Sequence, residues 1–364
     1  MEKSKSDLFI ICGERSGDLH GSYVIKYLLE KKPSLKIHCW GGELMQNAGG
    51  ILLENYRSYN LMGFLEVLIK LRFFINKIKL CQKHILEYKP KVVLLIDFPG
   101  FNMRIAKFSK KNGFNVHYYI PPKAWAWNKN RAFQLAHYTD KIYSILPFEK
   151  HFFRKYNCKI HYVGNPLTHY ISEKLINNKK IRRVISLLPG SRESELKYSI
   201  PVLKEIIKNY SKNKFLVCAV NNVDQKFYED FCNYNNVKIV YEDTYRAVSS
   251  SSLSIVMSGT ASLEVAYLNI PQIVIYKSST ISYIIARLLV NVNYISLVNL
   301  ILNKKLVTEL IQSDFNYKNL SHEIDKFHNN DQIDKMISGY QRLKKVIGKK
   351  NAKKEVVKNI LKSL

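Results

Sequence analysis

The sequence predicts an α/β protein built from two doubly wound domains, each with a parallel sheet. Short apolar runs of strand length alternate with helix-like segments in both halves of the chain, which is the pattern of a parallel sheet. Two of these runs end in glycine-containing turns that open a helix, at 189–192 and 258–260. The 364 residues, 46% of them hydrophobic, are enough for two domains of roughly 100 to 200 residues each.

The first half contains six apolar runs that we expect to form its sheet, at 8–12, 37–40, 92–96, 115–120, 141–146 and 160–163. The first run leads into a turn over 13–18, and a helix is expected from about 19 to 30. Gly164 and Pro166 then interrupt the periodicity and mark a join. We therefore expect a first domain over 1–165.

The second half repeats the alternation, with strands expected at 184–188, 215–220, 237–240, 253–257 and 272–275. From about residue 305 onward only helices are readable. These patterns predict a second domain over 166–345 and a separate helical segment over 346–364. Open α/β sheets bind ligands at the carboxyl ends of their strands, so the active site is expected there.

The composition limits the possible partners and chemistry. The net charge of +28 favours an anionic partner. Nucleic acid, an anionic membrane surface and phosphorylated substrates are all possible partners of this kind. The 6 cysteines form no C-x-x-C pair and the 10 histidines show no H-E-x-x-H spacing, so no metal and no cofactor are expected. No signal-peptide core and no bilayer-spanning run are readable, which predicts a cytosolic protein. Without a G-x-S-x-G elbow or a Walker lysine motif, hydrolases and kinases are disfavoured.

Asp97 is the candidate catalytic residue. It follows the apolar run 92–96 and is therefore expected at the carboxyl edge of a central strand. A carboxylate beside a low-dielectric sheet has a raised pKa and suits a general base that accepts a proton from a hydroxyl group. The residues alone leave a second interpretation open, in which Asp97 caps the helix that starts near Phe101.

Two turns in the second half are candidate phosphate sites. Arg192 follows the turn that contains Gly190 and Ser191, where a guanidinium group suits a diphosphate, or else pairs with Glu195 on the surface. In the second turn, the Gly259 and Thr260 amides suit a phosphate group, and Glu264, one helical turn later, suits ribose hydroxyls. The alternative is that Thr260 only caps the helix and that Glu264 is only solvated. The residues of this second turn and helix are Ser258, Gly259, Thr260 and Glu264.

Two further segments carry weaker signals. A glycine-containing turn after the first strand is a candidate cleft-lining segment, with Gly13, Ser16, Gly17 and Asp18 as its residues. The indoles of Trp125 and Trp127 follow another expected strand and suit either a sugar platform or a wall between domains, of which we favour the wall.

The helix expected over about 63–80 has two apolar stripes. Core packing explains the first stripe, which contains Phe64, Val67, Leu68, Leu71, Phe74, Ile75 and Ile78. The second stripe consists of Met62, Leu65, Ile69 and Phe73, with Lys70, Arg72, Lys77 and Lys79 beside it. Apolar residues bordered by cations suit shallow insertion among anionic lipid headgroups. Burial on both sides and a dimer contact remain the alternatives.

With these residues in place, the chain resembles the lipid-A-disaccharide synthase family over about 9–310. The first half carries the ordered motifs Gly13-Glu14, Ser16-Gly17-Asp18-Leu19, Leu61-Met62-Gly63-Phe64, Glu66-Val67, Ile96-Asp97-Phe98-Pro99, Phe101-Asn102 and Trp125-Ala126-Trp127. The second half carries Leu188-Pro189-Gly190-Ser191-Arg192, Glu195, Ser258-Gly259-Thr260-Ala261, Leu263-Glu264, Ser296-Leu297 and Asn299-Leu300. Each motif is weak by itself, and the ordered set is specific.

The resemblance implies an inverting glycosyltransferase of GT-B architecture that acts without a metal. Its substrates would be UDP-2,3-diacylglucosamine and 2,3-diacylglucosamine 1-phosphate, and its products UDP and the β-1,6-linked lipid A disaccharide. Asp97 would deprotonate the acceptor's 6-hydroxyl, and Glu264 would bind the ribose. Arg192, Asn299 and the Gly259 and Thr260 amides would stabilise the leaving diphosphate. The first domain would then be the acceptor domain, the second the UDP-sugar domain, and the last helix would pack back on the first.

The resemblance also favours the membrane interpretation of the second stripe, because both substrates carry acyl chains. It places the protein peripherally on the cytoplasmic face of the bacterial inner membrane and leaves the oligomeric state open. Another GT-B enzyme, such as a UDP-N-acetylglucosamine epimerase or a murein-precursor glycosyltransferase, is the nearest alternative. A basic nucleic-acid-binding protein is the alternative of a different class, although the chain contains no recognised nucleic-acid module.

Overall fold

The computed structural model describes residues 5–59, 71–127, 129–168, 171, 181, 183–221, 223–280, 283–284, 287, 292–327 and 329–364. The chain divides into two compact units. The first unit comprises Met1–Pro166 together with Lys350–Leu364, and the second comprises Leu167–Lys349. Both units are α/β in class, as the alternation of apolar runs predicts.

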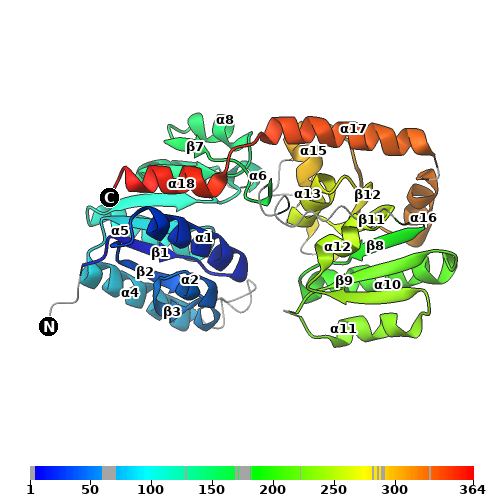
Figure 1. Cartoon of the computed structure of the whole chain (residues 1–364), viewed down its shortest axis with the longest axis horizontal. Coiled ribbons are helices and arrows are strands. Elements are labelled where there is room, and N and C mark those ends of the chain that lie inside the picture. Colours follow the sequence, from blue (N-terminus) through cyan, green and yellow to red (C-terminus); the bar gives the residue numbers. More distant parts are fainter. Residues whose placement is uncertain are drawn as a thin grey trace. The chain divides into compact units, whose positions relative to one another are not determined.

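The first unit contains a seven-stranded parallel sheet in the order β3-β2-β1-β4-β5-β6-β7, of which β1, β2, β3 and β7 are labelled in Figure 1. The strands are β1 Leu8–Ile11, β2 Ile37–Gly41, β3 Ile51–Asn55, β4 Val92–Ile96, β5 Asn115–Tyr119, β6 Lys141–Ser144 and β7 Ile160–Tyr162. Strand β1 pairs with β2 on one side and with β4 on the other. The strand order therefore reverses between β1 and β4, and such switch points are where open α/β sheets bind ligands.

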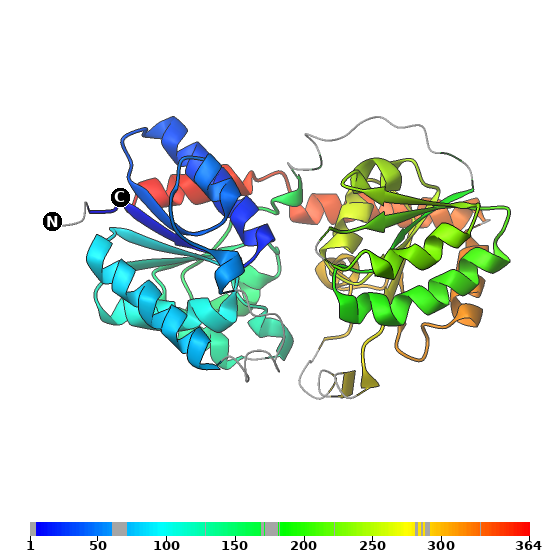
Figure 2. The ribbon, with the colours of Figure 1, turned by 90° about the horizontal axis from the view of Figure 1, so that it is seen from below.

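Helices cover both faces of this sheet. On one face lie α1 Arg15–Lys31, α2 Glu43–Asn47 and α18 Ala352–Leu361. On the other face lie α4 Leu71–Tyr88, α5 Pro99–Lys111, α7 Asn130–Tyr138 and α8 Glu149–Arg154. Short helices occur at η1 Tyr56–Ser58 and α6 Ala124–Trp127. Helix α18 packs along α1 (Figure 2), and its Val356 and Ile360 are buried in the same core as Ile10 of β1.

The second unit contains a six-stranded parallel sheet in the order β10-β9-β8-β11-β12-β13. Its strands are β8 Val184–Leu188, β9 Lys214–Ala219, β10 Val237–Tyr241, β11 Leu253–Met257, β12 Gln272–Tyr276 and β13 Thr308–Ile311. Its helices are α10 Glu193–Asn209, α11 Lys226–Glu229, η2 Asp230–Asn233, α12 Thr244–Ser249, α13 Thr260–Tyr267, α15 Leu297–Leu302, α16 Tyr317–Lys326 and α17 Asn330–Ile347. Here the strand order reverses between β8 and β11, which is the second switch point.

The structure corrects the sequence-based assignment of elements in several places. Helix α4 continues to Tyr88, beyond the end expected near residue 80. Helix α1 begins at Arg15, so most of the expected turn over 13–18 is the first turn of this helix. Two edge strands were not expected, β3 and β13, and β13 lies where only helices were readable. Both strands are short and partly exposed, and each contains a glutamate, Glu54 in β3 and Glu309 in β13. Neither strand therefore has the continuous apolar sequence that marks a central strand.

Candidate active site

The candidate residues gather at the two switch points. In the first unit Gly13 and Glu14 follow β1, and Asp97 follows the neighbouring strand β4. In the second unit the turn at 189–192 follows β8, and the turn at 258–260 follows the neighbouring strand β11. The two segments of each pair are far apart in the sequence. They come together because the strands that they follow are neighbours in the sheet.

The backbone at Asp97 is held in an unusual conformation. Asp97 and Phe98 both have left-handed φ angles, of 47° and 48°. Such a conformation costs a non-glycine residue about 1 to 3 kcal/mol and persists only where neighbouring groups enforce it. The Asp97 N–H donates to the Tyr119 carbonyl (3.0 Å), and the Asp97 carbonyl accepts from Tyr118 Oη (2.7 Å) and Asn102 Nδ2 (2.8 Å). These backbone contacts fix the carboxylate's point of attachment without using the carboxylate itself.

The neighbouring Phe98 explains why position 13 is a glycine. A Cβ at Gly13 would overlap the Phe98 ring. That ring stacks on Phe101 with 5.6 Å between centroids, and Phe101 stacks on Tyr59 at 5.5 Å. The Tyr59 hydroxyl in turn donates to the Cys12 carbonyl at the end of β1 (2.5 Å). The first turn after β1 and the strained turn after β4 are therefore packed against one another.

The Asp97 carboxyl group has the properties of a general base. Burial, and to a lesser extent the nearby Glu14 carboxylate, raise its pKa to about 6, while the Lys123 ammonium acts in the opposite direction. A base with a pKa near 6 is mostly ionised at neutral pH and still holds a proton better than an exposed aspartate does. Glu14 belongs to the Gly13-Glu14 motif but was not among the candidate site residues. Its Oε1 accepts from the Ser16 hydroxyl (2.6 Å).

The pKa of Asp97 predicts the pH dependence of activity. Below pH 6 the carboxyl group is protonated and cannot accept a proton, so kcat/KM is expected to fall as the pH is lowered through about 6. Glu14→Gln removes a negative charge that raises this pKa, so the acidic limb should move to lower pH. A pH profile of both proteins tests this, and a limb that moves upward or stays fixed would contradict the assignment.

Glu149 is a second buried carboxyl group that the sequence did not point to. It is 2% exposed, and burial raises its pKa to about 7. Its Oε1 accepts from the Trp125 indole N–H (3.1 Å) and its Oε2 from the Leu146 amide (3.3 Å). Glu149 thereby joins the segment after β5 to the segment after β6, both at the edge that carries Asp97. No local pattern reveals this pairing, because its partner indole is 24 residues away.

The other residues expected to line the cleft have different roles. Ser16 is exposed on the first turn of α1, and Gly17 packs on Cys12, which leaves no room for a larger side chain. Asp18 is 1% exposed and accepts from three backbone amides at the start of α2, those of Gly42 (2.8 Å), Leu44 (3.1 Å) and Met45 (3.1 Å). We therefore correct the expectation for Asp18, because its carboxylate is occupied in holding α2.

In the second unit, the turn after β8 is organised by Glu195. Gly190 has a φ of 135°, and Glu195 fills the space where a Cβ at Gly190 would lie. The Glu195 carboxylate accepts from the Ser191 amide (2.9 Å) and pairs with Arg192 Nη1 (2.9 Å). The Arg192 side chain is 68% exposed, so this ion pair orients it and leaves most of its five donors available.

The turn after β11 is open where a ligand is expected. Gly259 precedes α13 in an extended conformation, and no atom lies within 4 Å of the position that a Cβ would take. This leaves room for a ligand beside Gly259 at the start of α13, and the amides of a helix start favour an anion. Glu264 lies one turn further along, and burial raises the pKa of its carboxyl group. Ser258 has a structural contact, since its hydroxyl donates to the Ile295 carbonyl (3.0 Å).

Asn299 does not fit the role of a direct diphosphate ligand. Its side chain is fully buried. Its Nδ2 donates to the Val307 carbonyl (2.9 Å) and to Glu309 Oε1 (2.8 Å), and its Oδ1 accepts from the Leu306 (2.8 Å) and Val307 (3.0 Å) amides. These four bonds use the whole hydrogen-bonding capacity of an amide side chain. Asn299 instead fixes the start of α15 to β13.

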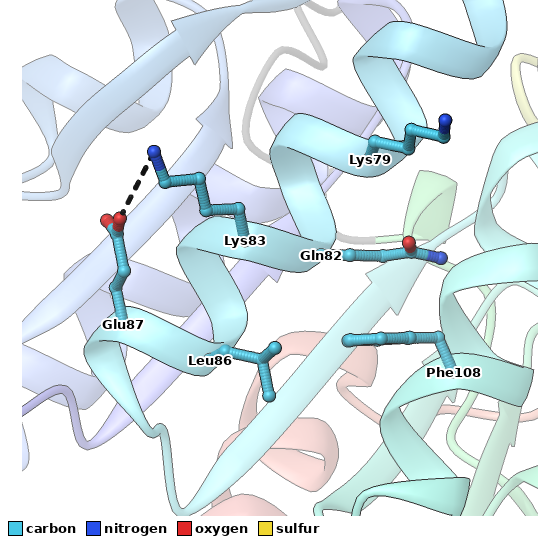
Figure 3. Close-up of a pocket in the computed structure, with 6 residues that line it drawn as sticks. All are labelled: Lys79, Gln82, Lys83, Leu86, Glu87 and Phe108. Atoms are coloured by element: carbon cyan, nitrogen blue, oxygen red, sulfur yellow. Dashed lines mark ion pairs between the residues drawn. The ribbon is translucent and has the colours of Figure 1, made fainter.

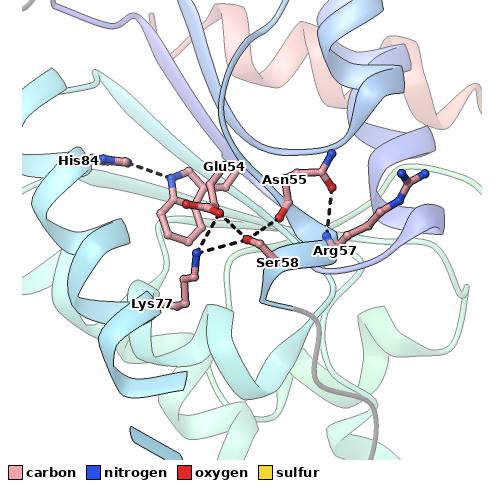
Figure 4. A network of polar contacts seen from close by, with 7 residues as sticks. Glu54, Asn55, Arg57, Ser58, Lys77 and His84 are labelled. Carbon is pink, nitrogen blue, oxygen red and sulfur yellow. Dashed lines mark hydrogen bonds and ion pairs between the residues drawn. The ribbon is translucent and has the colours of Figure 1, made fainter. Parts of the chain in front are cut away.

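Most of the predicted membrane stripe, namely Met62, Leu65, Ile69 and Lys70, lies outside the described residues. At the described end, Arg72 is exposed and Phe73 is 40% exposed. Ile75, expected in the core stripe, is 42% exposed instead. Lys77 is not a free cation, because its Nζ binds Glu54 Oε1 (2.9 Å) and the Ser58 hydroxyl (3.3 Å) (Figure 4). The same ammonium lies 5.5 Å from the centroid of the Phe73 ring.

A shallow groove lies between α4 and α5 (Figure 3). Its lining residues are Lys79, Gln82, Lys83, Leu86, Glu87 and Phe108. Helix α5 starts at the edge that carries Asp97 and runs away from it, so Phe108 lies near the opposite edge of the sheet. The groove is therefore separate from the switch point. Over the described parts of the chain, no cluster of His, Cys, Asp and Glu suits a metal ion, and no helix is long and apolar enough to cross a membrane.

Two doubly wound α/β units in one chain are the architecture of the GT-B fold. Solved structures share this fold. A UDP-GlcNAc 2-epimerase from Neisseria meningitidis bound to UDP-GlcNAc aligns with a TM-score of 0.66 at 15% identity, over 98% of this chain and 99% of that one. The glycotransferase of kitacinnamycin aligns with a TM-score of 0.65 at 9% identity, over 100% of both chains.

The sequence comparisons identify the family. The profile of lipid-A-disaccharide synthetase matches residues 8–361, and the chain belongs to this family of glycosyltransferases. The lipid-A-disaccharide synthase of Syntrophus aciditrophicus is 34% identical over 332 residues, 87% of each chain. Lipid-A-disaccharide synthase 1 of Legionella pneumophila is 34% identical over 363 residues, covering 95% of this chain and 94% of its own.

Proposed function

We propose that this chain transfers the 2,3-diacylglucosamine group of UDP-2,3-diacylglucosamine to the 6-hydroxyl of 2,3-diacylglucosamine 1-phosphate. The products are UDP and the β-1,6-linked disaccharide 1-phosphate of lipid A. The observation that carries the proposal is the Asp97 carboxyl group, held on a strained turn at the switch point with a pKa of about 6. A hydroxyl nucleophile needs such a base, and membership of the family supplies the substrates.

In the proposed reaction, Asp97 accepts the proton of the 6-hydroxyl as the oxygen attacks the anomeric carbon of the donor. The new C–O bond forms on the face opposite the bond to UDP, which breaks and leaves its electron pair on the diphosphate. One in-line displacement inverts the configuration at the anomeric carbon. The proton remains on Asp97 and is released to water after the products leave.

The second unit is proposed to stabilise the charge of the leaving diphosphate. Arg192 is exposed and oriented by Glu195, and Gly259 has open space where a Cβ would lie, at the start of α13 where the Gly259 and Thr260 amides are the proposed donors. Donors that already point at the place where negative charge develops stabilise a transition state without having to reorganise. Glu264, one turn into α13, is proposed to bind the ribose hydroxyls.

The experiment that tests this function is UDP release in mixed micelles with EDTA, measured with and without the phosphorylated acceptor. We expect release that requires the acceptor and appearance of the disaccharide by mass spectrometry. UDP-GlcNAc serves as the control donor and should not support release. Consumption of UDP-GlcNAc without an acceptor would favour an epimerase-like activity, and no release from the diacylated donor would contradict the substrate assignment.

The membrane is proposed as the place of this reaction, on the cytoplasmic face of the inner membrane. Both substrates carry acyl chains and are held in a bilayer, so the protein would meet them at the membrane interface. The net charge of +28 and the exposed Arg72 and Phe73 at the described end of the stripe support contact with anionic headgroups.

Replacing Leu65 and Ile69 together by Ser is expected to lower co-sedimentation with phosphatidylglycerol-containing vesicles several-fold, because two apolar side chains of the stripe are lost. The matched control is Phe133→Ser on α7, which removes an apolar side chain that is 59% exposed but outside the stripe. Equal vesicle binding by all three proteins would contradict the role of the stripe. A loss in both variants would point to general surface hydrophobicity instead.

A further inference from the structure

Lys123 lies at the same sheet edge as the proposed base. Strand β5 pairs in parallel with β4, and the Asp97 amide donates to the carbonyl of Tyr119, the last residue of β5. Lys123 follows four residues later, immediately before α6. Its position is therefore set by the strand that neighbours Asp97.

The ammonium group of Lys123 is exposed and lacks a partner within the described residues, where no hydrogen bond or ion pair reaches it. Its positive charge nevertheless lowers the pKa of both Asp97 and Glu149, so it lies within electrostatic range of the two carboxyl groups. Over the described part of the chain, Lys123 is thus a cation without a hydrogen bond or ion pair, and it follows the strand next to that of the proposed base.

The backbone that carries Lys123 is fixed on both sides. Pro121 and Pro122 precede it, and both are buried. The Ala126 amide donates to the Lys123 carbonyl (3.0 Å). Trp125 lies two residues after Lys123, and its indole N–H donates to Oε1 of the buried Glu149 (3.1 Å). A cation on a fixed backbone loses less conformational freedom when it binds a ligand, which is the property of a built binding site.

We propose that Lys123 binds the phosphate group of the acceptor, and that Glu149 positions it by holding Trp125. This inference rests on the proposed function. The 6-hydroxyl and the anomeric phosphate lie at two ends of the same sugar ring, so a hydroxyl placed at Asp97 brings the phosphate within one sugar's length of that carboxylate. Glu14 and Asp97 would repel a phosphate at this place. Lys123 supplies the compensating charge, in the compact form that suits a phosphate oxygen.

The test compares two acceptors, 2,3-diacylglucosamine with and without its 1-phosphate, in the UDP-release assay. Wild type should prefer the phosphorylated acceptor by roughly 10- to 100-fold in kcat/KM, the value of one charge-assisted hydrogen bond. Lys123→Met should abolish most of this preference by lowering activity on the phosphorylated acceptor alone. Lys123→Arg should restore part of it. Lys111→Met, an exposed lysine at the end of α5, is the matched control and should change neither value.

Each outcome decides between the interpretations. An equal loss on both acceptors, accompanied by an upward shift of the acidic limb, would mean that Lys123 acts only on the pKa of Asp97 and would overturn the proposal. An unchanged preference in Lys123→Met would also overturn it. Absence of acceptor-dependent UDP release in wild type would contradict the proposed function itself, and the role of Lys123 with it.

Discussion

Asp97→Asn is expected to lower kcat for disaccharide formation by roughly 100- to 10,000-fold, the range that a positioned general base contributes. Asparagine has the size of aspartate and cannot accept the proton of the 6-hydroxyl. The contacts that fix position 97 use its backbone N–H and carbonyl, so they survive the substitution. The KM for the donor should change little, because the proposed diphosphate ligands belong to the second unit. Steady-state UDP release over both substrates measures the two effects separately.

The matched control is Asp140→Asn, at the start of β6. This carboxylate also accepts from a backbone amide, that of Val116 (2.9 Å), and pairs with Lys110, but it lies at the amino edge of the sheet. It should keep kcat near the wild-type value. Near-normal kcat in Asp97→Asn, with disaccharide still formed, would assign the base to another group, of which Glu14 is the nearest candidate.

Asp18→Ala is expected to destabilise the first unit by about 3 kcal/mol, because the substitution leaves three backbone amides of the α2 start without their acceptor. Two of these amides, those of Gly42 and Met45, share one carboxylate oxygen. Asp18→Asn keeps an acceptor oxygen but loses the charge, and should destabilise by less. Urea denaturation followed by circular dichroism measures the difference.

The same variant separates a structural role from a role in acceptor binding. At a temperature where Asp18→Ala is still folded, its KM for the acceptor should remain close to that of wild type. Unchanged stability together with a strongly raised acceptor KM would return Asp18 to the site and contradict the structural assignment.

The class of fold was predictable because the signals that define it are local. The run Val92–Ile96 is apolar throughout, is fully buried as β4, and ends at the same residue in the sequence pattern and in the structure. The position of Asp97 at the strand's carboxyl edge follows from that run alone. The GT-B class, predicted from the resemblance, is confirmed by the shared fold of the solved structures.

The roles of individual polar side chains were harder to predict, because their partners are distant in the sequence. Asp18 binds amides 24 to 27 residues away, and Glu149 binds an indole 24 residues away. The Asn299 side chain donates to Glu309 of β13 and to the neighbouring Val307 carbonyl, and the sequence pattern did not predict this edge strand. A motif therefore indicates that such residues matter, while only the tertiary structure separates those that hold the site together from those that face a substrate.

The packing of α18 has a consequence for biosynthesis. Residues 352–361 leave the ribosome after the entire second unit, yet they cover one face of the sheet that begins with β1. While translation proceeds, Ile10, Val24 and their neighbours lack the apolar side chains of Val356 and Ile360. The unit synthesised first is thus completed last, and until then the part of its apolar core that α18 covers stays exposed, which favours aggregation.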